Sequence, residues 1–151
     1  MKRFIFTGII VFLLDIMSKQ FVSHFFMEYD SISIIPHFFS ITYVKNTGVA
    51  FSMLQGNILF IIVISVLVIG IIFYFFQRQI KSYWEEIFYG MILGGALGNL
   101  IDRLFYGYVI DFFDFHLLGY SMAIFNVADI FIVCGVILLF GMEFWKERKV
   151  K

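Results

Sequence analysis

Residues 57–76 read NILFIIVISVLVIGIIFYFF, a run of twenty residues that contains no charged side chain. A helix needs about 20 mostly apolar residues to cross the hydrocarbon core of a bilayer. The run therefore predicts a lipid-facing transmembrane helix. It places the chain among membrane proteins rather than soluble globules.

Three more apolar stretches lie outward from this run, at residues 4–24, 86–101 and 122–142. The stretch at 86–101 is slightly short for a span, and the other two are long enough. We expect an all-α polytopic membrane protein with four transmembrane helices in one domain, residues 1–151. Residues 4–24 follow two basic residues, but no small-residue cleavage site comes after them, which favours a retained helix over a signal peptide.

The composition agrees with this class. Hydrophobic residues make up 62% of the chain and charged residues 15%, whereas soluble domains are about 25% charged. One cysteine, Cys134, excludes a disulfide-stapled secreted fold, and a formal net charge of zero leaves no basic face for nucleic acid. We therefore expect no nucleic-acid partner.

The basic residues predict the orientation. Eight of the eleven lie in the two terminal segments or in the connection after residue 76, whereas the other two connections hold only Lys45 and Arg103. Positive residues stay on the cytoplasmic side, so both termini should be cytoplasmic. Residues 25–56 and 102–121 then form extracytoplasmic segments. The alternation at 32–44 before the turn at 46–48 predicts a small sheet at the membrane surface, although its aromatic residues could serve only as interfacial anchors.

Ionisable residues inside the spans are candidate functional groups, because each costs several kcal/mol at membrane depth unless it is paired or hydrated. Asp15 and Lys19 lie one helical turn apart and could form a structural ion pair, or could position a neighbouring site. Asn99, Asp102 and Arg103 share a helix face at the outer boundary, where Arg103 could simply pair with Asp102. Gly90, Gly94 and Gly98 form a stripe suited to close helix packing.

Two further acidic residues form the most complete candidate catalytic set in the sequence. Asp111 lies among aromatic residues of the second outer segment, and Asp129 shares a helix face with Asn126 in the outer half of the fourth span. Two carboxylates that share one proton can activate water and polarise a carbonyl, as in aspartic proteases. The spacing of the three histidines matches no zinc-ligand pattern. We expect no metal and no organic cofactor.

Five segments match one family in order and spacing: DIMSK at 15–19, NTGVAFS at 46–52, GGALGNLIDR at 94–103, VIDF at 109–112 and FNVAD at 125–129. Together they resemble bacterial lipoprotein signal peptidase, also called signal peptidase II, over about the whole chain. The resemblance implies an intramembrane aspartic endopeptidase of the bacterial cytoplasmic (inner) membrane. Such an enzyme removes signal peptides from prolipoproteins just before a diacylglyceryl-modified cysteine, near the extracytoplasmic face.

The resemblance also assigns residues. The catalytic pair falls on Asp111 and Asp129, although Asp102 could replace Asp111; we prefer Asp111 because Asp102 has Arg103 beside it as a counter-ion. The supporting or substrate-contacting positions are Asp15, Lys19, Asn46, Gly48, Asn99, Asp102, Arg103 and Asn126. In the family the first outer segment forms a surface sheet and the second a short helix. The implied partners are S-diacylglyceryl prolipoproteins, membrane lipids and globomycin-type inhibitors.

A small transporter or channel subunit is the rival hypothesis, with Asp15, Lys19, Asp102 and Asp129 as a proton or ion relay. It leaves the segment at 46–52 and Asp111 unexplained. The sequence also lacks the inverted repeats that are typical of transporters.

Overall fold

The computed structural model describes residues 1–48, 56–79, 82–117 and 120–150. Within these ranges the chain forms four helices and four strands. The helices are α1 (Lys2–Phe25), α2 (Ile58–Gln79), α3 (Tyr83–Tyr106) and α4 (Val127–Val150). The strands are β1 (Ser31–Ile35), β2 (Phe39–Asn46), β3 (Val109–Leu117) and β4 (Tyr120–Ser121).

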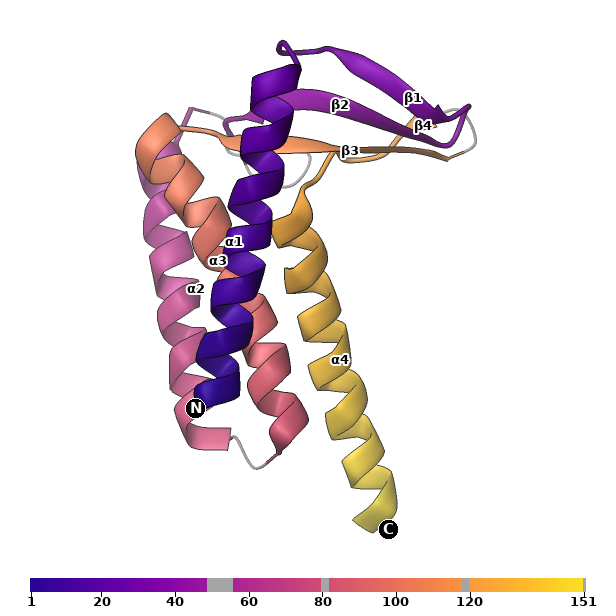
Figure 1. The fold of residues 1–151 in the computed structure, drawn as a ribbon. Coiled ribbons are helices and arrows are strands. Elements are labelled where there is room, and N and C mark those ends of the chain that lie inside the picture. The colour runs from indigo at the N-terminus through magenta and orange to yellow at the C-terminus, as the bar shows by residue number, and fades with distance from the viewer. Residues whose placement is uncertain (49–55, 80–81, 118–119, 151) are drawn as a thin grey trace.

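The helices form a bundle, and the sheet lies across one end of it (Figure 1). Helix α3 contacts each of the other three helices and is the centre of the bundle. Both chain ends lie at the end of the bundle opposite the sheet (Figure 1). The described parts of the two predicted outer segments therefore lie together, away from the termini.

Three of the described helices are long and apolar enough to cross a membrane: α1, α2 and α4. Their outer faces carry many exposed large apolar side chains, such as Leu59 and Leu67 on α2 and Phe140 on α4. Such a surface is unfavourable in water but suits lipid. Helix α3 is as long as α1 and α4, but it carries four charged residues and is not among these three.

Two helices, α3 and α4, have bounds that differ clearly from the sequence prediction. Helix α3 is longer than the predicted span 86–101, because Ser82 and Glu85 form a capping box at its start and Gly107, with φ of 78°, ends it in a left-handed conformation. Helix α4 begins at Val127, not at residue 122. Phe125, just before it, bridges to Phe113 of β3, so these apolar residues belong to the sheet region.

The predicted glycine stripe on α3 is a packing surface. A Cβ atom on Gly94 would lie 2.5 Å from the carbonyl oxygen of Gly8 in α1, and one on Gly90 would lie 2.6 Å from that of Phe4. The neighbouring Gly95 faces α4 instead, where a Cβ would lie 2.5 Å from the carbonyl oxygen of Ala128. The small residues thus bring α1 and α4 close to opposite sides of α3.

We expect Gly94→Ala to destabilise the protein by about 1–3 kcal/mol, because the new methyl group overlaps the backbone of α1. Gly70→Ala in α2 is the matched control, since nothing lies within 4 Å of a Cβ there. Thermal unfolding in one detergent would compare the two variants with the wild type. Equal midpoints for Gly94→Ala and Gly70→Ala would contradict the packing role.

The four strands form an antiparallel sheet in the order β1-β2-β3-β4. The predicted sheet in 25–56 is therefore confirmed for the described residues, and residues 49–55 lie outside them. The expectation of a short helix in the second outer segment is wrong for its described part, which forms β3 and β4. The β-branched and aromatic residues at 109–115 favour a strand, and β2 supplies the partner edge.

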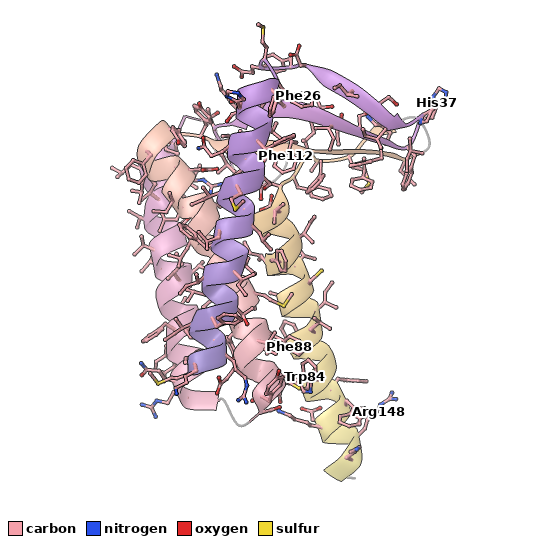
Figure 2. The ribbon with its side chains drawn as sticks, viewed as in Figure 1. Phe26, His37, Trp84, Phe88, Phe112 and Arg148 are labelled. Carbon is pink, nitrogen blue, oxygen red and sulfur yellow. The ribbon has the colours of Figure 1, made fainter. Side chains whose placement is uncertain are left out.

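The sheet is fixed to the bundle by a small apolar core. Phe112 of β3 packs with Val22 of α1, Tyr43 of β2 and Ile110, and Phe26 covers this cluster. Figure 2 shows Phe112 and Phe26 close together near the upper end of α1. This core holds the start of β3, and with it Asp111, against the helices.

Candidate functional site

A cavity of about 520 Å³ lies where the sheet meets α3 and α4. Five of the ten residues predicted from the sequence line it: Asn46, Asn99, Arg103, Asp111 and Asp129. The other five, which are Asp15, Lys19, Gly48, Asp102 and Asn126, are hydrogen bonded to these residues or to one another. The structure therefore brings all ten predicted residues into one connected site.

Asp111 is a buried residue of β3, and both of its carboxylate oxygens accept amide hydrogen bonds. Asn46 Nδ2 donates to Oδ2 at 2.8 Å, and Asn126 Nδ2 donates to Oδ1 at 2.7 Å. Burial, and next the charge of Asp129, raise the pKa of Asp111 to about 7, although the two amide bonds act in the opposite direction. A carboxyl group with this pKa can hold or release a proton near neutral pH.

Asp129 lies in the first turn of α4, and Asn126 directly precedes the helix. The two residues cap each other: Asn126 Oδ1 accepts the backbone N–H of Asp129 at 3.1 Å, and Asp129 Oδ2 accepts the backbone N–H of Asn126 at 3.2 Å. Asn99 Nδ2 donates to Asp129 Oδ1 at 2.8 Å. The N-terminus of a helix favours negative charge, so this position stabilises an ionised carboxylate.

Asn126 is shared by the two acids, since it donates to Asp111 and caps the helix that carries Asp129. The sequence predicted that Asn126 and Asp129 share a helix face. That expectation is corrected here, because Asn126 is the capping residue outside α4. The bridge between Phe113 and Phe125 brings β3 beside this cap.

A buried ionic cluster lies behind Asn99. The Lys19 ammonium contacts Asp15 Oδ2 at 2.6 Å and Asp102 Oδ2 at 2.9 Å, and donates to Asn99 Oδ1 at 2.9 Å. The predicted Asp15–Lys19 ion pair is thus present. The expectation that Arg103 is the counter-ion of Asp102 is wrong, because adjacent helical residues diverge by about 100° and Asp102 faces Lys19.

Arg103 lines the cavity and donates to two backbone carbonyls. Its Nη1 contacts the oxygen of Asn99 at 3.2 Å, and its Nη2 contacts the oxygen of Gly48 at 3.1 Å. Among the described residues, the buried Nε of Arg103 has no hydrogen-bond partner. A buried N–H group without a partner is costly, so the cavity offers a donor to an incoming acceptor.

The apolar wall of the cavity was not predicted from the sequence. It consists of Val109, Ala123, Ile124, Phe125, Ile130, Val133 and Cys134. Apolar residues inside apolar segments carry no distinguishing signal, and only the fold shows which of them face the acids. Within the described parts of the chain, no group of three or more His, Cys, Asp or Glu residues could hold a metal ion.

Comparison with known proteins gives a consistent result. The family described as signal peptidase (SPase) II matches residues 7–145. Lipoprotein signal peptidase of Fusobacterium nucleatum is 40% identical over 148 residues, covering 97% of this chain and 88% of that protein. Lipoprotein signal peptidase of Caldanaerobacter subterraneus is 46% identical over 129 residues, with coverages of 85% and 87%.

A solved structure, described as a bacterial membrane enzyme, superposes with a TM-score of 0.90 at 32% identity. The superposition covers 100% of this chain and 92% of the chain in the solved structure. Fold, sequence and the membrane-spanning helices agree. The chain therefore belongs to the signal peptidase II family of membrane peptidases.

Proposed function

We propose that the protein removes signal peptides from diacylglyceryl-modified prolipoproteins, cutting immediately before the lipidated cysteine, with Asp111 and Asp129 as its catalytic pair. The observation that carries this assignment is that both carboxylates line one cavity and are held by one asparagine, Asn126. Family membership supports the peptidase activity and gives no support to the ion-relay hypothesis.

The environments of the two acids favour different roles. Asp129, at a helix N-terminus with two N–H donors, is the ionised member that takes a proton from water. Asp111 keeps its proton up to about pH 7 and donates it to the oxygen of the scissile carbonyl. Water oxygen adds to the carbonyl carbon and forms a neutral gem-diol. The C–N bond of the gem-diol then breaks. Asp129 gives its proton to the leaving nitrogen, and Asp111 recovers a proton from a hydroxyl group of the diol.

Asp102 is a supporting residue in this proposal. It does not line the cavity, and its Oδ2 is occupied by Lys19 and by the backbone N–H of Ile110 at 3.3 Å. Asn46 and Gly48 belong to one turn, because the Gly48 N–H donates to Asn46 Oδ1 at 2.9 Å. This turn presents the Asn46 amide to Asp111 and the Gly48 carbonyl to Arg103. Among the described residues the Nε of Arg103 has no partner, and we propose that it donates to a substrate carbonyl.

The membrane arrangement supports delivery of a lipidated substrate. We propose that α3 is the fourth span, since it lies among three apolar helices and matches their length. We also keep the single domain 1–151, the cytoplasmic termini and the bacterial inner membrane from the sequence prediction. The cavity wall at Ile130, Val133 and Cys134 follows α4 away from the sheet, so an apolar chain can reach the acids from the lipid.

The lipid on the substrate should dominate affinity, because each buried CH₂ group contributes about 0.8 kcal/mol. The test is cleavage of a diacylglyceryl prolipoprotein by the purified protein, with the unlipidated precursor as control. Cleavage of the lipidated form alone is the expected result. Folded wild-type protein that cuts neither form would exclude the proposed function. Inhibition by globomycin-type peptides remains a prediction from the resemblance.

The pKa of Asp111 predicts the alkaline limb of the pH profile. Below about pH 7 Asp111 is protonated and can donate; above it the pair carries two negative charges and the acid is lost. Single-turnover cleavage should therefore fall about tenfold per pH unit above neutrality. In Asp129→Asn, infrared titration of Asp111 should give a lower midpoint, because a neighbouring charge is gone. A flat profile up to pH 9 would contradict this role.

A further inference from the structure

We propose that Lys19 is a positioning residue that fixes which way two side-chain amides point, those of Asn99 and Asn126, and thereby presents donors to both acids. This inference rests on the proposed function of Asp111 and Asp129 and adds a role for a residue that does not line the cavity. Among the described contacts Lys19 is hydrogen bonded to neither acid; Asn99 and Asn126 link it to them, and its charge acts on Asp111 from a distance.

The Lys19 ammonium is almost completely buried and meets three oxygens. They belong to Asp15 of the same helix and to Asp102 and Asn99 of α3, at 2.6 to 2.9 Å. An ammonium group has three N–H donors and no acceptor. Each donor thus has one partner, and the atom of Asn99 that faces Lys19 must be its oxygen.

The orientation of the Asn99 amide in turn determines the hydrogen bonds of the Asn126 amide. With its oxygen toward Lys19, Asn99 directs Nδ2 to Asp129 Oδ1 at 2.8 Å. The same oxygen accepts Asn126 Nδ2 at 3.1 Å, and that nitrogen also donates to Asp111 Oδ1 at 2.7 Å. The oxygen of Asn126 is left for the backbone N–H of Asp129 at 3.1 Å. Each of the two amide nitrogens therefore donates to one acid, that of Asn99 to Asp129 and that of Asn126 to Asp111.

The opposite orientation would be harmful to the pair. If Asn99 turned its amide over, its oxygen would face the carboxylate of Asp129 and its nitrogen would face Asn126 Nδ2. An acceptor beside a carboxylate disfavours the ionised form, so protons would bind the pair more tightly. The obligate donor at Lys19 excludes this arrangement whether Asp129 is ionised or protonated, whereas Asp129 itself can face either end of the amide once it carries a proton.

The charged groups around Lys19 allow a matched design. Asp15 also accepts the N–H of Ala128 from α4, and Asp102 accepts that of Ile110 from β3. Arg103 and Asp129 lie on the far side of Asn99. Wild-type protein holds two acids and one cation in this cluster, a net charge of −1. Replacing Lys19 together with Asp102→Asn leaves Asp15 alone, and the net charge of −1 is kept.

The experiment compares Lys19→Met/Asp102→Asn with Lys19→Gln/Asp102→Asn. Glutamine offers an N–H donor to Asn99, because the Asp15 carboxylate beside this position favours the nitrogen end of its amide, whereas methionine has similar length and no donor. We expect kcat of the methionine variant to be at least about 30-fold below that of the glutamine variant, with KM within about twofold. We also expect its infrared midpoint for proton release from the Asp111–Asp129 pair to be about one pH unit higher.

Equal kcat and equal midpoints in the two folded variants would overturn the proposal and leave Lys19 as an ion-pair partner only. The titration needs no substrate, so a failure of the proposed peptidase activity would not be confused with this result. Asn99→Ala keeps every charge of the cluster and guards against misfolding of the double variants. It should reproduce the loss of turnover, and an unchanged kcat in Asn99→Ala would also overturn the proposal.

Discussion

Asp129→Asn and Asp111→Asn should each lower cleavage of a lipidated prolipoprotein by at least about a thousand-fold, because each removes one partner of the proton transfer. Asparagine has nearly the shape of aspartate, so the cavity is preserved. Without Asp129 no group takes the proton from water, and without Asp111 no group donates to the scissile carbonyl. Both acids line the same cavity, but neither can substitute for the other because each transfers a different proton.

Asp114→Asn is the matched control for Asp111→Asn. Asp114 lies three residues further along β3, where Thr42 donates to it at 3.0 Å and His116 contacts it at 3.2 Å, outside the cavity. We expect cleavage by this variant within about threefold of wild type, since Asp114 does not line the cavity and the asparagine oxygen can still accept the hydrogen bond from Thr42. If Asp114→Asn lost cleavage as completely as Asp111→Asn, the result for Asp111→Asn would no longer support a specific role of Asp111.

Asp102→Asn separates the two assignments that the sequence left open. The Asp102 oxygen accepts from Lys19, and the asparagine oxygen can accept the same bond. Turnover should therefore be reduced but measurable. An inactive Asp102→Asn beside an active Asp111→Asn would transfer the catalytic role to Asp102.

The sequence was sufficient to predict the membrane class and the membership of the site. The glycines on α3 predict close packing, which is confirmed, and the charge-free run forms α2, a helix long and apolar enough to cross a membrane. The resemblance to the family supplied the ten candidate residues, of which all but Gly48 are polar. Polar groups are retained at membrane depth only where they are paired or hydrated. Their clustering followed from that cost.

The connections within the site could not be predicted in the same way. Spacing along a helix shows which residues share a face, but it does not show the facing helix. It therefore predicts Arg103 as the partner of Asp102, whereas the structure pairs Asp102 with Lys19. Hydropathy likewise treats residues 122–126 as part of the last span, although the bridge between Phe125 and Phe113 places them with the sheet. Long-range contacts of this kind depend on the fold.

Asn126→Leu should reduce cleavage by at least about a hundred-fold and lower stability by about 1–2 kcal/mol. The two effects have different causes. The oxygen of Asn126 caps α4 through the N–H of Asp129, whereas its nitrogen donates to Asp111. Leucine has neither group, so the helix end loses its cap and the buried Asp111 carboxylate loses one of its two donors.

Asn126→Ser separates these causes. A serine hydroxyl is a good helix cap and can accept from Asp129, but it is too short to replace the amide nitrogen at Asp111. We expect the unfolding midpoint of Asn126→Ser to lie close to that of the wild type, while its cleavage rate stays close to that of Asn126→Leu. If serine restored the rate together with stability, Asn126 would act through the helix end alone. If it restored neither, the cap on α4 would depend on the whole amide network that reaches Asn99.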